Sequence, residues 1–146
     1  MGLISKELSM SASSAPSELC KNSTKGIGTD LLDQRRIARL LEKPNVRFSQ
    51  RILTAAELTL WAEKSHSVNF LAKRFAAKEA ISKALGTGIA QGVSFQQMNI
   101  YSDPLGKPVV ELTGAALAVM TAMGGQQVLL SLSDEGEMIL AFAAVC

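Results

Sequence analysis

The stretch Arg74–Gly88, which reads RFAAKEAISKALGTG, decides the fold. Together with the apolar residues before it, this stretch predicts one long helix over Ser67–Leu85. The alanines permit close packing, and Gly86 suits the position just after the end of a helix. We therefore expect this helix to be the spine of the fold.

The segments on either side read alternately as strands and helices. Thr54 and Glu57 form a capping box that starts a second helix, which runs to about Lys64. Asp103–Gly106 reads as the turn of a hairpin. The other expected elements are a strand over 25–30, helices over 31–42 and 115–123, hairpin strands 94–101 and 108–112, and a final hairpin of 127–133 and 137–145. Helices grouped between antiparallel hairpins predict an α+β fold, with an antiparallel sheet packed against the long helix.

Length and composition indicate one domain and no membrane span. The chain has 146 residues, 47% of them hydrophobic, and its longest apolar runs fall far short of the roughly 20 residues that a spanning helix needs. We expect residues 1–24 to be a disordered N-terminal extension, either native or vector-derived, and residues 25–146 to form the domain. Cys20 and Cys146 have neither zinc-site spacing nor the density of a disulfide framework, which favours a reducing cytoplasm.

The net charge of +2 hides a basic segment near the start of the domain. Between residues 26 and 51 the bases Arg35, Arg36, Arg39, Lys43, Arg47 and Arg51 oppose only Asp30, Asp33 and Glu42. This segment is either a solvated helix face or a docking surface for one acidic partner. Nucleic acid fits less well, because its binders are usually basic over the whole domain and only Phe48 is available for stacking.

Glu79 and Lys83 are four positions apart and so share a helix face. They form either a surface salt bridge, worth about 0.3 to 0.5 kcal/mol, or part of a phosphate site. The second interpretation is favoured by donors on the same helix and by glycines after it that let backbone approach an anion. These residues are Arg74, Lys78, Ser82, Gly86 and Gly88.

Asp30, at the end of the first expected strand, also has two interpretations. It either caps the helix that follows or meets Glu79 in the fold. In the second case two carboxylates would supply the hard oxygen ligands that Mg²⁺ prefers, with a substrate phosphate completing the coordination. The metal would then polarise a phosphoryl group while Lys83 neutralises charge on the leaving side.

Other catalytic patterns are missing from the sequence. His66 has no serine nucleophile or orienting acid at a recognisable spacing, so we interpret it as an ordinary surface or capping histidine. The sequence also lacks a Gly-x-x-x-x-Gly-Lys-Ser/Thr motif, which disfavours ATP hydrolysis through a P-loop.

Several blocks in the same order point to a known family. These blocks are Gly26–Asp30, Arg47–Phe48, Arg51–Thr54 with Glu57, Phe70–Ala80, Ser82–Ala84, Gly88–Ile89 and Leu105–Pro108. From about Lys25 to Ala144 the sequence closely resembles holo-(acyl-carrier-protein) synthase, the small trimeric bacterial branch of the 4′-phosphopantetheinyl transferases. The resemblance implies that family's α+β fold.

The resemblance also implies a reaction. In fatty acid biosynthesis, 4′-phosphopantetheine would move from coenzyme A to a serine hydroxyl of an apo acyl carrier protein, releasing adenosine 3′,5′-bisphosphate and requiring Mg²⁺. Asp30 and Glu79 match the family's metal-binding acids and Lys83 its lysine facing the pyrophosphate, so these three are the expected catalytic residues. The expected coenzyme A contacts are Arg74, Lys78, Ser82, Lys83, Gly86, Lys107 and Pro108. The general base stays open between a metal-bound water and a carboxylate.

The resemblance further implies protein partners. Arg36, Arg47, Phe48 and Arg51 match the region that grips the acidic helix of the carrier protein. The family is a homotrimer with sites at subunit interfaces, so apolar sheet residues are expected to be buried between chains.

Two alternatives remain beside this expectation. One is the same reaction on a carrier domain of a polyketide or peptide synthase, and the other is a non-catalytic module that binds coenzyme A or the carrier. Asp134 replaces the histidine of many relatives in the last expected turn, which leaves a nucleotide contact there open.

Overall fold

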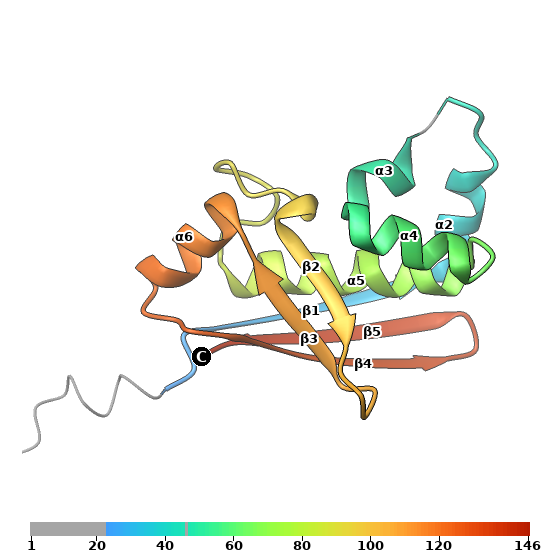
Figure 1. Ribbon diagram of the computed structural model, residues 1–146. Coiled ribbons are helices and arrows are strands. Elements are labelled where there is room, and N and C mark those ends of the chain that lie inside the picture. Colours follow the sequence, from blue (N-terminus) through green and yellow to red (C-terminus); the bar gives the residue numbers. More distant parts are fainter. Residues whose placement is uncertain (1–22, 46) are drawn as a thin grey trace, which may run out of the picture.

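A computed structural model describes residues 23–45 and 47–146, so most of the expected N-terminal extension lies outside the described residues. The elements in chain order are β1 (Gly26–Asp33), α2 (Gln34–Leu41), α3 (Phe48–Ile52), α4 (Ala55–Glu63), α5 (Val68–Ala84), η1 (Phe95–Gln97), β2 (Met98–Ser102), β3 (Pro108–Leu112), α6 (Gly114–Ala122), β4 (Val128–Glu135) and β5 (Met138–Val145). One antiparallel sheet has the strand order β1-β5-β4, and β2 pairs with β3 in a second sheet. Figure 1 shows α5 lying along one face of the larger sheet. The predicted α+β fold is confirmed.

Helix boundaries follow local capping chemistry. The capping box at Thr54 and Glu57 forms as predicted, and Ser67 caps α5 by accepting a hydrogen bond from the backbone N–H of Phe70. Within the described residues no helix is both long enough and apolar enough to cross a membrane. The five-residue helix α3 was not predicted from the sequence.

The start of α2 differs from the expectation. The predicted helix start at Leu31 is wrong, because β1 continues its pairing with β5 as far as Asp33. Asp33 then caps α2 by accepting a hydrogen bond from the backbone N–H of Arg35 at 3.0 Å. Hydrogen bonds from the Arg35 side chain lower the pKa of Asp33 to about 2, so the cap stays ionised at neutral pH. Asp30 is therefore not the helix cap.

Two glycines let β1 lie directly against α5. A Cβ atom on Gly26 would sit 2.0 Å from the carbonyl oxygen of Ala84, and one on Gly28 would sit 2.0 Å from that of Ala80. Ala80 and Ala84 are themselves buried, so small residues on both elements make the contact. The strand and the helix thus approach more closely than larger side chains would permit.

The two faces of the larger sheet have different surroundings. The face toward α5 is covered, and Leu32, Ile139 and Ala141 belong to the buried core. The other face carries apolar residues that keep between 42% and 65% of their surface exposed: Ile27, Leu31, Leu129, Leu140 and Phe142. The strand register aligns Leu31 with Leu140, so these residues share one side of the sheet.

Replacing Gly28 with Ala should destabilise the fold, because the added methyl group would collide with backbone of α5. Overpacking a well-packed core typically costs about 1 to 3 kcal/mol, and a backbone obstacle puts this change at the upper end. Urea unfolding at fixed protein concentration should show a free energy of unfolding lower by about 2 to 3 kcal/mol. Ser102→Ala, at an exposed position of β2, is the control. Equal stability of Gly28→Ala and wild type would contradict the close contact.

Candidate active site

Asp30, Glu79 and Lys83 lie where β1 packs on the C-terminal half of α5. Side chains alternate along a strand, so Asp30 is on the same side of β1 as Gly28, the side that meets α5. The Lys83 ammonium donates to the carboxylate of Asp30 at 3.2 Å and to the backbone carbonyl of Thr29 at 2.9 Å. The Asp30 side chain is 17% exposed and that of Lys83 is 52% exposed, so the cluster reaches solvent.

Glu79 is the less stabilised of the two carboxylates. Burial raises the pKa of Glu79 above its ordinary value, and the charge of Asp30 raises it further, while Lys83 opposes both. Within the described residues Lys83 makes its ion pair with Asp30 and not with Glu79. Glu79 and Lys83 are four residues apart and share one face of α5, and Lys83 contacts Asp30, so Glu79 faces the side of the helix on which the Asp30 carboxylate lies. Among the described residues the predicted salt bridge between Glu79 and Lys83 is not formed.

The residues present fit Mg²⁺ better than a metal that needs a full set of protein ligands. No group of three or more His, Cys, Asp or Glu side chains is assembled anywhere in residues 23–45 and 47–146. Mg²⁺ usually takes one or two carboxylates and fills its remaining positions with water and substrate phosphate. Asp30 and Glu79 would be the two carboxylates, and their mutual repulsion would be relieved by a cation between them.

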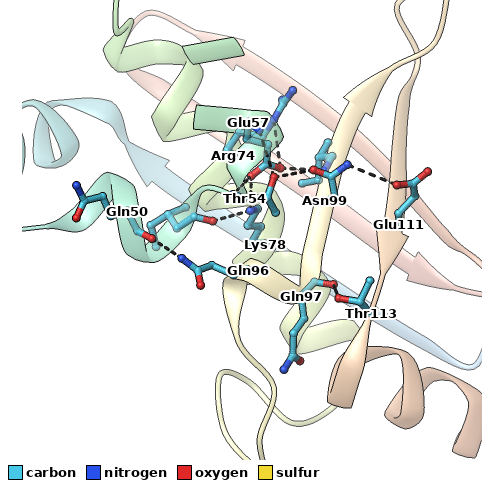
Figure 2. Close-up of polar contacts among 12 residues, drawn as sticks. Gln50, Thr54, Glu57, Arg74, Lys78, Gln96, Gln97, Asn99, Glu111 and Thr113 are labelled. Atoms are coloured by element: carbon cyan, nitrogen blue, oxygen red, sulfur yellow. Dashed lines mark hydrogen bonds and ion pairs between the residues drawn. The ribbon is translucent and has the colours of Figure 1, made fainter. Parts of the chain in front are cut away.

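Three other residues predicted to contact coenzyme A lie in or beside the hydrophobic core. Lys78 and Ser82 have no exposed surface, and Arg74 is 8% exposed. The Lys78 ammonium is 2.6 Å from Glu57, and Ser82 donates to the backbone carbonyl of Glu79 (Figure 2 shows the Lys78 surroundings). This burial in the single chain argues against direct contacts of Lys78 and Ser82 with coenzyme A.

Arg74 is held differently from Lys78. Its guanidinium lies 4.5 Å from the ring centre of Phe70, and its Nε is 3.8 Å from Glu57 without a hydrogen-bond partner among the described residues. Burial lowers the pKa of Arg74 and the charge of Glu57 opposes that shift. Apart from its places in the capping box and in one motif of the family resemblance, nothing in the sequence indicates the role of Glu57.

The remaining predicted coenzyme A contacts lie on loops and on the smaller sheet. Gly86 follows the C-cap of α5 with φ +78° and has open space where a side chain would be, close in sequence to Lys83. Lys107 is exposed in the β2–β3 turn, and Pro108 is the first residue of β3. Neither has a side-chain hydrogen bond or ion pair with Asp30, Glu79 or Lys83 in the described chain, so their role stays a prediction.

Asp134 lies in β4 and not in the expected turn. Its carboxylate is 3.3 Å from the Lys73 ammonium and accepts a hydrogen bond from Asn69 at 3.4 Å. Asp134 therefore ties the end of the larger sheet to α5.

The predicted carrier-docking residues lie on α2 and on α3 with its N-cap. Arg47 and Arg51 are exposed and line a cavity of about 410 Å³, whose wall includes Phe95. Arg36 lines a second cavity of about 290 Å³ with Arg39, Leu40 and Lys43. Phe48 is half-buried, with its ring packed edge-on against Phe75 at 5.2 Å between centroids. Five basic residues of the segment between residues 26 and 51 thus line two cavities. They are the three predicted arginines together with Arg39 and Lys43.

Replacing Glu79 with Gln should stabilise the metal-free protein more at about pH 7 than at about pH 4. Because the pKa of Glu79 in the folded chain lies above its ordinary value of 4.5, folding favours the protonated carboxyl. The stability contributed by this proton is complete below the unfolded pKa and is lost as the pH rises through the folded pKa. Urea unfolding in EDTA at both pH values measures the effect. The same difference between variant and wild type at the two pH values would contradict it.

Comparisons with known proteins identify the family of this chain. A family model described as the 4′-phosphopantetheinyl transferase superfamily matches residues 26–141, which include Asp30, Glu79 and Lys83. A holo-[acyl-carrier-protein] synthase of Shewanella amazonensis is 47% identical over 121 residues, covering 83% of this chain and 97% of that enzyme.

Solved structures give the same result. The holo-[acyl-carrier-protein] synthase of Neisseria meningitidis is 46% identical with a TM-score of 0.77, and the match covers 85% of this chain and 99% of that one. The Helicobacter pylori holo-[acyl-carrier-protein] synthase in complex with coenzyme A is 29% identical with a TM-score of 0.71, covering 82% and 99%. The chain therefore belongs to the 4′-phosphopantetheinyl transferase superfamily, within its holo-[acyl-carrier-protein] synthase family.

Proposed function

We propose that this chain transfers 4′-phosphopantetheine from coenzyme A to a serine hydroxyl of an apo acyl carrier protein, in fatty acid biosynthesis and in the cytoplasm. The convergence of Asp30, Glu79 and Lys83 carries the proposal, because it joins two metal-binding carboxylates to a cation suited to a phosphate. The related Helicobacter pylori and Bacillus anthracis synthases were solved in complex with coenzyme A, which supports coenzyme A as the donor here.

The reaction is a displacement at phosphorus. The serine oxygen forms a bond to the phosphorus that bears the pantetheine arm, and the bond from that phosphorus to the bridging oxygen breaks. Adenosine 3′,5′-bisphosphate leaves with the bridging oxygen, and the serine proton passes to a carboxylate or to water. Mg²⁺ held by Asp30 and Glu79 would supply Lewis-acid polarisation of the phosphoryl group.

Lys83 supplies the second positive charge. Its side chain is half-exposed and its ammonium is held by one carboxylate and one carbonyl, so it can turn from Asp30 toward a phosphate in the site. There it would stabilise the negative charge that develops on the departing bisphosphate. In addition to Lys83, the coenzyme A contacts still proposed are Gly86, Lys107, Pro108 and Arg74, of which Arg74 is only 8% exposed.

We also propose that the carrier protein docks through Arg36, Arg47, Phe48 and Arg51. The three arginines are exposed and form no ion pair within the described part of the chain, so they are available to an acidic helix. Such charges raise the rate of encounter more than the final affinity, and salt screens them.

A homotrimer accounts for the exposed apolar face of the larger sheet. Ile27, Leu31, Leu129, Leu140 and Phe142 share that face. Contiguous apolar surface of this kind commonly marks an interface with another protein chain. We propose that three copies bury it against one another.

The transfer is tested by the intact mass of an apo acyl carrier protein after incubation with this chain, coenzyme A and Mg²⁺. We expect a mass gain of one phosphopantetheine that EDTA abolishes. Asp30→Ala and Glu79→Ala should each slow the transfer by about 100-fold or more, because a lost metal ligand forfeits several kcal/mol of transition-state stabilisation. Glu63→Gln, at an exposed position of α4, is the matched control and should leave the rate unchanged.

Three outcomes would count against the proposal. Full activity of either alanine variant would contradict the metal assignment. Transfer to a polyketide or peptide synthase carrier domain, and not to a fatty-acid carrier, would assign the reaction to the first alternative. Tight binding of coenzyme A or the carrier without any transfer would favour the non-catalytic module.

Replacing Leu140 with Glu should break the trimer without unfolding the chain. Leu140 is 45% exposed in the single chain, so a carboxylate there can stay hydrated, but it would be buried unpaired between copies. Light scattering on a sizing column should give three times the 15.5 kDa chain mass for wild type and a lower mass for the variant. Leu105→Glu, at a position 95% exposed in the β2–β3 turn, should remain trimeric. A monomeric wild type would contradict the assembly.

A further inference from the structure

Helix α3 is too short to hold its own position. It has five residues, and Arg47 at its N-cap makes no side-chain capping bond. Isolated helices shorter than about 12 residues are marginal in water even with good sequences. Contacts from other elements must therefore fix α3 on the domain.

Two side chains from outside α3 bind its backbone carbonyl groups. The Gln96 side-chain amide donates to the carbonyl of Gln50 at 2.5 Å, as Figure 2 shows. The Lys78 ammonium donates to the carbonyl of Ile52, also at 2.5 Å. Gln96 comes from η1 and Lys78 from α5, so the end of α3 is attached to two separate elements.

The Lys78 attachment is part of a buried network. Lys78 is fully buried, and its ammonium is 2.6 Å from one carboxylate oxygen of Glu57. Glu57 also accepts hydrogen bonds from the backbone N–H groups of Thr54 and Ile100, each at 2.9 Å. One buried carboxylate therefore joins α5 to the start of α4 and to β2, while Lys78 extends the connection to α3.

The same stretch of α5 faces the active site. Successive residues of an α-helix point about 100° apart, because one turn takes 3.6 residues. Lys78 is directed at α3. Glu79, the next residue, shares a helix face with Lys83, whose ammonium contacts the Asp30 carboxylate. Arg47 and Arg51, two of the proposed carrier contacts, lie at the two ends of α3. The distance between carrier docking and catalytic carboxylates is thus set through consecutive residues of one rigid helix.

We infer that Lys78 and Gln96 are positioning residues for carrier recognition. Lys78 attaches α3 to the catalytic helix α5 and Gln96 attaches it to η1, so that Arg47 and Arg51 hold the carrier serine at the active site. This inference rests on the proposed function. Lys78 has no exposed surface, so it can affect the carrier protein only through α3.

A pair of variants isolates the Lys78 attachment. Lys78→Met alone would leave Glu57 charged and unpaired in the core, so both proteins in the test carry Glu57→Gln. In Glu57→Gln alone, the amine of Lys78 still donates to the carbonyl of Ile52. In Glu57→Gln/Lys78→Met, no donor remains at position 78 while the shape of the side chain is kept. The two proteins therefore differ in the donor at position 78, whose partners in Glu57→Gln are the Ile52 carbonyl and the side-chain amide at position 57.

Steady-state transfer assays should separate the two variants. We expect the double variant to raise the KM for the carrier protein about tenfold over Glu57→Gln, the size of one lost hydrogen bond. The KM for coenzyme A should stay within about twofold, because the bond does not touch that site. Equal carrier KM values for the two variants, or parallel changes in both KM values and kcat, would overturn the inference.

Gln96→Ala gives a second test at an exposed position, where unfolding is not expected. Hydrogen exchange should be faster at the amides of Arg51 and Leu53, whose hydrogen bonds to Arg47 and Ser49 close the turns of α3. Gln126→Ala, exposed between α6 and β4, is the matched control. Unchanged exchange in α3 together with an unchanged carrier KM would overturn the role of Gln96.

The outcome also distinguishes this inference from the proposed function. If wild type neither transfers phosphopantetheine nor binds apo carrier protein in a titration without coenzyme A, the proposed function fails and the inference falls with it. If wild type transfers normally and the variants match their controls, only the inference fails.

Discussion

The close contact between β1 and α5 is the constraint on which the rest of the structure depends. Gly26 and Gly28 leave no side chain between strand and helix, and each lies against a carbonyl of α5. Asp30 is the next residue on that side of β1, so its carboxylate is delivered to the helix beside Lys83 and Glu79. The close contact that packs β1 on α5 therefore also assembles the candidate active site. A change in this packing disturbs the site.

Burial decides which charges on α5 are structural and which are available for chemistry. Lys78 and Glu57 are buried together and are satisfied by backbone partners, so they hold elements in place. Glu79 and Asp30 are both partly exposed. Burial raises the pKa of Glu79, and the negative charge of Asp30 raises it further. Carboxylates whose negative charge is not fully balanced by neighbouring groups are typical of functional sites, because a bound cation or substrate supplies the missing positive charge or hydrogen bonds.

The sequence predicted the features that depend on local chemistry. The capping box at Thr54, the extent of α5 and the glycine after it all follow from neighbouring residues, and all are confirmed. The start of α2 could not be read in the same way, because Asp30 and Asp33 are both plausible caps and the pairing of β1 with the distant β5 selects Asp33. The family came from the order of several motifs, which local pattern alone would not have identified.

The roles of Lys78 and Lys83 on α5 could not be predicted from neighbouring residues either. Lys78 and Lys83 both follow alanine-rich sequence, and only the positions of α3 and β2 show that Lys78 is enclosed while Lys83 reaches solvent. Helix α3 has no side-chain cap and is very short, so its formation depends on Gln96 and Lys78, which lie far along the chain. The charged residues of the site could be identified from the sequence. Which of them have a structural role and which a chemical role could not.

We propose that Asp30 and Glu79 together hold one divalent cation at the contact between β1 and α5. Electron paramagnetic resonance of Mn²⁺, used in place of Mg²⁺, measures the free ion and gives the bound ions by difference, and it does not depend on turnover. With coenzyme A present, we expect one bound ion per chain in wild type and none at the same concentration in Asp30→Asn or in Glu79→Gln. Undiminished Mn²⁺ binding in either variant would contradict the account.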